Sequence, residues 1–128
     1  MKKAVYLILT IAFFYACTGN NEQINCEDFK TGTFEYYEDS IRIEVERKEN
    51  FQIEKTPFGD SRYDVEWLSD CEYTATLTET DFQALEPKVG TVYELEITST
   101  TEDTYAYRIK VRGTEFMYFG EMKKVGSN

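Results

Sequence analysis

Histidine is absent from this chain of 128 residues. Its absence removes the most common general base and zinc ligand, and every site in which histidine activates a serine or cysteine nucleophile. Only seven glycines occur, and none of them forms a glycine-rich phosphate loop. We therefore expect a protein with no enzymatic activity and no cofactor.

Carboxylates are the only abundant reactive groups. A glycosidase-like pair of acids could be drawn from Asp60, Asp64, Glu66 or Asp70, and residues 60–64 offer clustered oxygens for calcium. Most acids, however, alternate with apolar residues and so belong to a solvent-facing surface. Arg62 also interrupts the calcium-like run, which lacks the glycine of a defined calcium loop. We therefore expect a solvated acidic surface and no metal site.

Positive charge is scarce. The chain has 24 acidic and 14 basic residues, and its net charge of −10 becomes −12 if residues 1–16 are removed with their two lysines. Such a surface repels phosphate backbones and anionic lipid headgroups. A nucleic-acid partner is therefore not expected.

A long apolar run occurs at one place, residues 4–16, directly after Lys2 and Lys3. The run is shorter than a membrane span and typical of a signal peptide. Residues 14–17 (FYAC) resemble a relaxed lipobox, so we expect residues 1–16 to be a cleaved signal helix and Cys17 to carry lipid. An ordinary secretory signal is the alternative. Residues 17–28 then form a polar lipidated tether to a membrane.

The location follows from the residue after Cys17. Thr18 stands where an aspartate would resemble the known inner-membrane retention signal. We therefore expect a cell-envelope protein anchored in the outer membrane and facing the periplasm, with the cell surface as the alternative.

The chain has three cysteines, and lipidation would occupy Cys17. Cys26 and Cys71 then have one possible pairing in an oxidising compartment. A bridge across this ~45-residue loop would stabilise the fold by roughly 4 kcal/mol on the chain-entropy model. The alternative is that one of the two is a reactive thiol.

Apolar and polar residues alternate with the period of a strand through most of residues 29–125, which we expect to form one domain. Short turn signals separate the alternating runs. A short helix is expected at residues 81–86, ended by Pro87. The predicted strands cover residues 29–38, 41–48, 50–56, 61–69, 71–78, 90–100, 104–112 and 114–123.

Eight locally connected strands predict an all-β fold, an antiparallel up-and-down barrel or a strongly curled sheet. A barrel of eight strands has room for packed side chains or for one small ligand. Because the predicted strands are short and the aromatic residues are bulky, we expect a filled interior. The expected core cluster comprises Trp67, Tyr73, Tyr93, Tyr105 and Tyr107.

Two basic residues interrupt this pattern. Arg47 and Lys55 share the parity of the apolar residues in their strands, which places both on the inner face near one rim. With Tyr63 and Trp67 they would frame an anion-binding mouth. The alternative is that both turn outward and pair with nearby glutamates.

Four short segments resemble a family of short, uncharacterised lipocalin-like lipoproteins of Gram-negative bacteria. They are residues 26–34 (CEDFKTGTF), 65–73 (VEWLSDCEY), 104–107 (TYAY) and 120–122 (GEM). The resemblance implies a lipocalin-like barrel in the cell envelope and supplies no catalytic motif. Two functions stay open: a structural or partner-binding role toward another envelope protein, and a carrier role for a small hydrophobic or anionic ligand.

Overall fold

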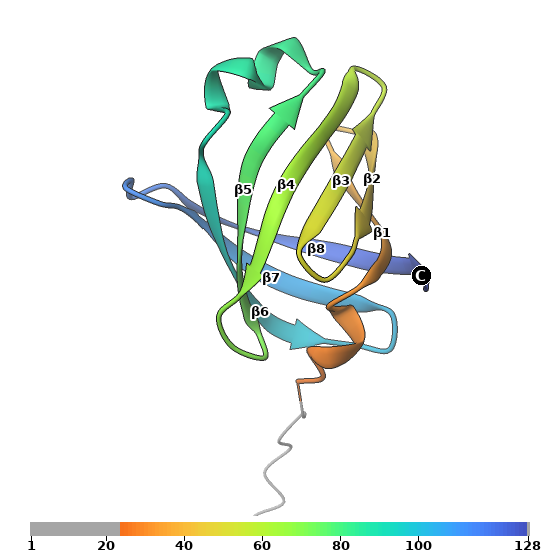
Figure 1. The fold of residues 1–128 in the computed structure, drawn as a ribbon. Coiled ribbons are helices and arrows are strands. Elements are labelled where there is room, and N and C mark those ends of the chain that lie inside the picture. The colour runs from red at the N-terminus through yellow and green to blue at the C-terminus, as the bar shows by residue number, and fades with distance from the viewer. Residues whose placement is uncertain (1–23, 128) are drawn as a thin grey trace, which may run out of the picture.

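The computed structural model describes residues 24–127, which form an eight-stranded closed antiparallel barrel. Each strand pairs with the next along the chain and β8 pairs back with β1, so the up-and-down barrel is confirmed (Figure 1). The strands are β1 (Gly32–Glu38), β2 (Ile41–Arg47), β3 (Phe51–Thr56), β4 (Gly59–Trp67), β5 (Glu72–Thr80), β6 (Val92–Thr100), β7 (Thr104–Val111) and β8 (Met117–Gly126).

Two short 3-10 helices accompany the barrel, η1 (Glu27–Phe29) and η2 (Gln83–Lys88). The prediction that Pro87 ends a helix at residues 81–86 is wrong, because Pro87 lies inside η2. The Leu85 N–H donates to the Phe82 carbonyl and the Val89 N–H donates to the Glu86 carbonyl. The first bond closes the turn before Pro87, and the second closes the turn that contains Pro87, whose fixed φ suits a 3-10 turn.

In most strands, buried and exposed side chains alternate as the sequence predicts, and β4 is a clear example. Ser61, Tyr63 and Val65 are buried inside the barrel, whereas Asp64 and Glu66 are exposed outside it. Residues i and i+2 of a strand share one face, so a half-polar strand buries every second side chain.

Strand β3 has the opposite parity from the one its sequence indicates. Gln52 and Ile53 stand opposite Tyr63 and Arg62 of β4, and paired residues of an antiparallel sheet share a face. Gln52 is therefore inside and buried, with Glu54 on the same face, whereas Ile53 is outside.

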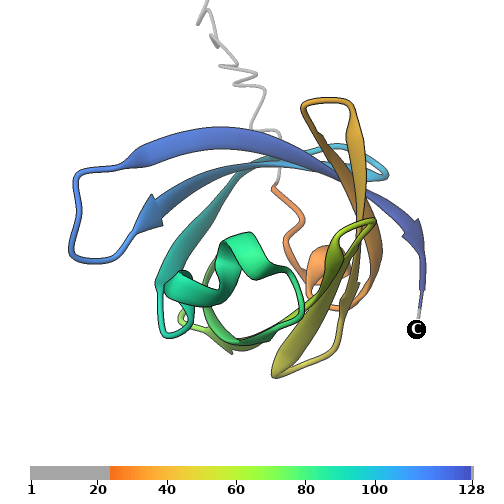
Figure 2. The same ribbon diagram turned by 90° about the horizontal axis from the view of Figure 1, so that it is seen from above.

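The two ends of the barrel are built differently. At one end, η1 places Phe29 in the core, where its side chain is 1% exposed. At the other end, η2 lies across the part of the barrel end next to β5 and leaves the rest uncovered, and Leu85 packs against the core from there (Figure 2). We call these the closed end and the open end.

The folded domain begins earlier than predicted. Cys26 is buried, and the Asn25 N–H donates to Thr100 Oγ1 at 3.0 Å, so residues 25–28 pack on the barrel instead of forming a tether. The expected signal peptide at residues 1–16 and the lipidated Cys17 lie outside the described residues. Within residues 24–127, no helix is both long and apolar enough to cross a membrane.

Candidate functional site

Arg47 is the centre of the closed end, and its side chain is fully buried. The guanidinium lies against the rings of Phe34 and Tyr73, 4.7 and 4.9 Å from their centroids. It donates hydrogen bonds of 2.9 to 3.1 Å to Gln52 Oε1, the Phe29 carbonyl, Tyr73 Oη and Tyr105 Oη. Arg47 therefore joins η1, β3, β5 and β7 in one sealed network.

The four residues predicted to frame an anion-binding mouth do not come together. Arg47 is inside, as predicted, but at the sealed end. The inward placement of Lys55 is wrong: it is exposed on the outer face and its Nζ lies 2.9 Å from Glu46 Oε1. Its position follows from the reversed parity of β3.

The other two predicted mouth residues lie on the inner face of β4. Tyr63 is buried toward the open end, where its ring contacts that of Tyr93 at 6.1 Å between centroids. Trp67 is half-buried at the closed end, 4.5 Å from Tyr73 between ring centroids. Lys30 Nζ covers the Trp67 ring at 5.4 Å. Tyr63 and Trp67 therefore lie toward different ends of the barrel.

The predicted aromatic core cluster is confirmed. Tyr73, Tyr105 and Tyr107 are buried, and Trp67 and Tyr93 pack against the same core. Within residues 24–127, Trp67 Nε1 is the one buried side-chain nitrogen or oxygen without a hydrogen-bond partner.

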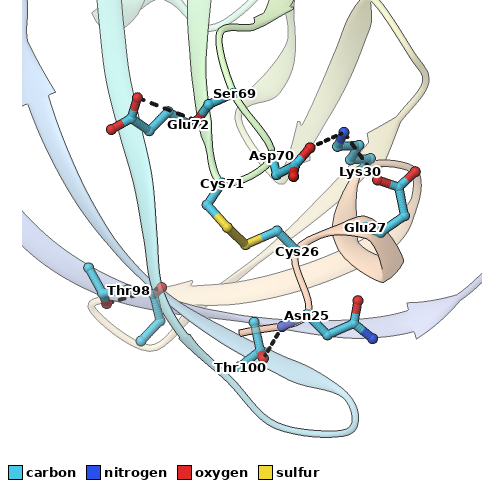
Figure 3. Close-up of a disulfide and its surroundings, with 11 residues drawn as sticks. Asn25, Cys26, Glu27, Lys30, Ser69, Asp70, Cys71, Glu72, Thr98 and Thr100 are labelled. Atoms are coloured by element: carbon cyan, nitrogen blue, oxygen red, sulfur yellow. Dashed lines mark hydrogen bonds and ion pairs between the residues drawn. A yellow bond between two sulfur atoms is a disulfide. The ribbon is translucent and has the colours of Figure 1, made fainter. Parts of the chain in front are cut away.

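The disulfide between Cys26 and Cys71 is also confirmed, with alpha carbons 5.3 Å apart (Figure 3). Both sulfurs are bonded, so the reactive-thiol alternative does not apply. Beside the bridge, Lys30 Nζ lies 3.1 Å from Glu27 and 3.8 Å from Asp70. The disulfide and this ion pair hold η1 against the turn between β4 and β5.

Glu54 is the acidic side chain inside the barrel toward the open end. Tyr36 Oη donates to Glu54 Oε2 at 3.3 Å, and Gln52 Nε2 donates to Glu54 Oε1 at 3.4 Å. Because Gln52 Oε1 accepts from Arg47, Gln52 lies between the two charged groups. Burial raises the pKa of Glu54 to about 7, although the Tyr36 hydrogen bond and the Arg47 charge favour the ionised form.

Five tyrosines surround Glu54. Burial raises the pKa of each phenol above its usual value, and the Glu54 charge raises each pKa further. The phenols therefore remain protonated hydrogen-bond donors at neutral pH. Together with Glu54 they form the open-end cluster: Tyr36, Glu54, Tyr63, Tyr93, Tyr107 and Tyr118.

Solvent contact separates this cluster from the closed end. The side chains of Arg47, Phe29 and Tyr105 are at most 1% exposed. In the open-end cluster, Tyr36, Glu54 and Tyr93 are half-buried, and Tyr118 is 41% exposed. Solvent therefore reaches four of the six side chains of the open-end cluster, whereas Tyr63 and Tyr107 are buried and the network around Arg47 is sealed.

Sequence reasoning missed Glu54, Tyr36 and Tyr118 as members of a site. The alternation of Phe51 and Ile53 with Gln52 and Glu54 suggested that the two polar residues were outside. A signal was available in β4, since Ser61, Tyr63 and Val65 fix the inner face of the strand that pairs with β3.

The acidic residues proposed for a glycosidase pair or calcium lie on the outer surface. A hollow of about 510 Å³ lies over the outer face of β4 and β5, lined by Asn50, Arg62, Asp64, Val65, Glu66, Thr74 and Thr76. Arg62 lies 3.9 Å from Asp64 there. In the part of the chain that the structure describes, no group of three or more potential metal-binding side chains occurs.

A second exposed feature is the hairpin between β7 and β8, which projects from the barrel (Figures 1 and 2). Its aromatic tip, comprising Phe116, Met117, Tyr118 and Phe119, exposes between 41% and 69% of each side chain. Monomeric proteins rarely expose large apolar side chains side by side, so such a patch indicates a contact surface.

Comparisons of the chain with protein-family models, curated proteins and solved structures found no match.

Proposed function

We propose that this protein is a lipid-anchored, extracytoplasmic binding protein that takes a small ligand at the open end of its barrel and catalyses no reaction. One observation carries the binding role: four of the six side chains of the open-end cluster, Tyr36, Glu54, Tyr93 and Tyr118, keep contact with solvent, whereas the closed end is sealed around Arg47. The interior of an eight-stranded barrel is just wide enough to be filled by side chains or to hold one small ligand.

The chemistry of the open-end cluster supports this role. Tyrosine rings present apolar faces for packing, and their hydroxyl groups offer polar contacts that orient a ligand. The cluster draws these groups from six strands, so closure of the barrel preorganises them. A preorganised aromatic surface with a few polar groups is typical of small-molecule sites.

The cellular location rests on the sequence alone. Lys2 and Lys3, the apolar run of residues 4–16, and Cys17 after Ala16 support a lipoprotein signal and an anchor in the outer membrane. The resemblance to lipocalin-like lipoproteins supports the same location. We expect mass spectrometry of membrane fractions to find an acylated N-terminus at Cys17, and Cys17→Ser to release the protein from membranes. An unmodified N-terminus elsewhere would contradict the anchor.

The binding role is tested by titrating the isotope-labelled whole protein with benzyl alcohol, a small neutral aromatic probe. We expect NMR signals of Tyr36, Tyr93 and Tyr118 to shift in a saturable way, while those of Glu66 and Thr74 on the outer face do not. Shifts confined to the outer hollow or to Phe116 and Phe119 of the hairpin tip, or no saturable shift, would contradict a site at the open end.

A second candidate function is a partner-binding role, favoured by the exposed aromatic tip of the β7–β8 hairpin. Aromatic residues and methionine are enriched in protein interfaces. A photocrosslinking amino acid at Phe119 should capture one discrete envelope protein in cells, and the same group at Phe58, which is 57% exposed, should not. Equal crosslinking at both positions would contradict this role.

A further inference from the structure

The open-end cluster places one carboxyl group among aromatic faces. Glu54 projects from β3 into the barrel, where Tyr36 of β1 and Tyr63 of β4 form hydrogen bonds with it. Three further tyrosines, of β6, β7 and β8, lie close enough for its charge to raise their pKa. The hydrogen-bond donors to Glu54 are neutral: the Tyr36 hydroxyl at 3.3 Å, the Gln52 amide at 3.4 Å, and the Tyr63 hydroxyl. Bonds of this length are weak, so the carboxylate keeps capacity to accept a shorter, charge-assisted bond.

The charge around Glu54 favours a cation over an anion. The groups that act on it electrostatically or by hydrogen bonds are neutral, negative or separated from it by Gln52: Tyr36, Glu38, Arg47 and Tyr63. Glu38 is exposed at the end of β1 and raises the phenol pKa of Tyr118, so it adds negative charge at the rim. An anion would meet two carboxylates here.

Five basic side chains on the outer wall of the barrel form ion pairs with acids there. Arg42 pairs with Glu35 and Glu44, Lys55 with Glu46, Arg62 with Asp64, Arg108 with Glu96 and Arg112 with Glu94. These side chains point away from the open-end cluster because they share the parity of the outer residues. The outer face therefore supplies no cation to Glu54.

We propose that the open-end cluster binds a small organic cation carrying a protonated amine, with the Glu54 carboxylate as its counter-ion and hydrogen-bond acceptor and the tyrosine rings around it. This inference rests on the proposed binding function and names its ligand class. An ammonium group over an aromatic face gains electrostatic attraction, and this gain grows when the group is desolvated. It also replaces the anionic ligand that the sequence suggested, since the predicted Arg47 and Lys55 mouth does not form.

Glu54 also sets the pH dependence of this site. With its pKa raised to about 7 by burial, Glu54 is partly protonated in the free protein at neutral pH. A protonated amine favours the ionised carboxylate, so binding strengthens as pH rises through about 7 and then levels off. The surrounding tyrosines, Tyr36, Tyr63, Tyr93, Tyr107 and Tyr118, do not titrate in this range because their pKa values are raised.

The test compares three probes that share a ring and differ in charge: benzylammonium, benzyl alcohol and phenylacetate. Each is titrated by calorimetry into the whole protein in a non-ionic detergent, with detergent alone as the blank. At pH 8 we expect benzylammonium to bind at least 10-fold more tightly than benzyl alcohol, and phenylacetate more weakly than both. At pH 5.5 the benzylammonium affinity should fall at least 10-fold, and that of benzyl alcohol should not change.

Two variants assign the effect to Glu54. Glu54→Gln keeps the size of the side chain, and it should abolish the preference for benzylammonium while keeping benzyl alcohol binding. Glu66→Gln, on the exposed outer face of β4, should bind all three probes as the unmodified protein does. A melting curve of each variant checks that it is folded.

The outcomes separate this inference from the proposed function. Equal affinity for the three probes, a preference for phenylacetate, or a benzylammonium preference that survives in Glu54→Gln would overturn the cation site while the binding function stands. Failure of all three probes to bind the folded protein would overturn both.

Discussion

The closed end and the open end of this barrel each hold one charged side chain inside, and the two are solvated in opposite ways. Arg47 has no exposed surface, and it donates four hydrogen bonds to oxygen atoms while packing between aromatic rings. Glu54 keeps solvent contact and accepts hydrogen bonds from neutral donors, two of them 3.3 and 3.4 Å long. A buried charge that is fully bonded serves the fold, whereas one that is partly bonded is available to a ligand.

Removing Arg47 should therefore cost more stability than removing the disulfide or Glu54. Arg47→Ala leaves the Phe29 carbonyl and the Gln52 side chain without their donor and opens a void at the core. We expect a loss of about 5 kcal/mol in the free energy of unfolding, measured by urea denaturation. Arg108→Ala removes an exposed, ion-paired arginine and should cost less than about 1 kcal/mol. A loss below about 1 kcal/mol for Arg47→Ala would contradict the conclusion that the buried Arg47 network stabilises the closed end.

The disulfide is the second support of the closed end. Replacing both Cys26 and Cys71 with serine frees a loop with a sequence separation of 45 residues. The chain-entropy model gives a loss of about 4 kcal/mol, measured by the same denaturation. Because Glu54 lies toward the other end, NMR signals of the open-end cluster should keep their positions in the folded fraction. Loss of open-end signals before global unfolding would show that the ends are not independent.

Glu54→Gln should raise the free energy of unfolding instead of lowering it. The substitution removes a carboxylate whose ionised form is disfavoured by burial. The pKa of Glu54 is about 7 in the folded protein, against an ordinary value of 4.5 for the unfolded chain. Between these values the unfolded chain has released a proton that the folded chain keeps, so stability of the unmodified protein falls as pH rises from 4.5 to about 7. We expect Glu54→Gln to be more stable by about 3 kcal/mol at pH 8 and equal at pH 4. An equal or lower stability at pH 8, against Glu66→Gln as the control, would contradict the raised pKa.

Replacing Lys55 should have the smallest effect on stability, and it tests whether the odd-numbered residues of β3 lie outside the barrel. As an exposed residue paired with Glu46, its replacement by alanine should change the free energy of unfolding by less than about 0.5 kcal/mol. It should also leave probe binding unchanged. Weakened binding of phenylacetate to Lys55→Ala would contradict this placement and support the anion-binding mouth that the sequence suggested.

The fold was accessible from the sequence because most strands are half-buried and alternate strictly. Ile43 and Val45, or Leu95 and Ile97, mark the inner face without ambiguity, and short turns leave neighbouring strands antiparallel. The disulfide followed from the number of cysteines: with Cys17 predicted to carry lipid, Cys26 and Cys71 have one possible pairing.

The candidate site was harder to predict because β3, the strand that carries Glu54, buries its polar residues and places its apolar residues outside. In β3 the apolar Phe51 and Ile53 lie outside, where the Arg62 guanidinium covers the Phe51 ring at 4.2 Å. Gln52 and Glu54 lie inside, where Arg47 and Tyr36 bond them. The groups that form hydrogen bonds with these polar residues inside the barrel come from other strands. Only the closed barrel therefore shows that hydrogen bonds compensate the cost of burying them. Local periodicity cannot carry that information.

The measurement that tests the central contrast most directly is a titration of the Glu54 side-chain carboxyl carbon by NMR, with and without benzylammonium. We predict that Glu54 in the free protein titrates with a pKa of about 7, and that saturating benzylammonium lowers this pKa while benzyl alcohol does not. A Glu54 pKa near 4.5 in the free protein, or one that benzylammonium leaves unchanged, would contradict the assignment of Glu54 as the open-end counter-ion.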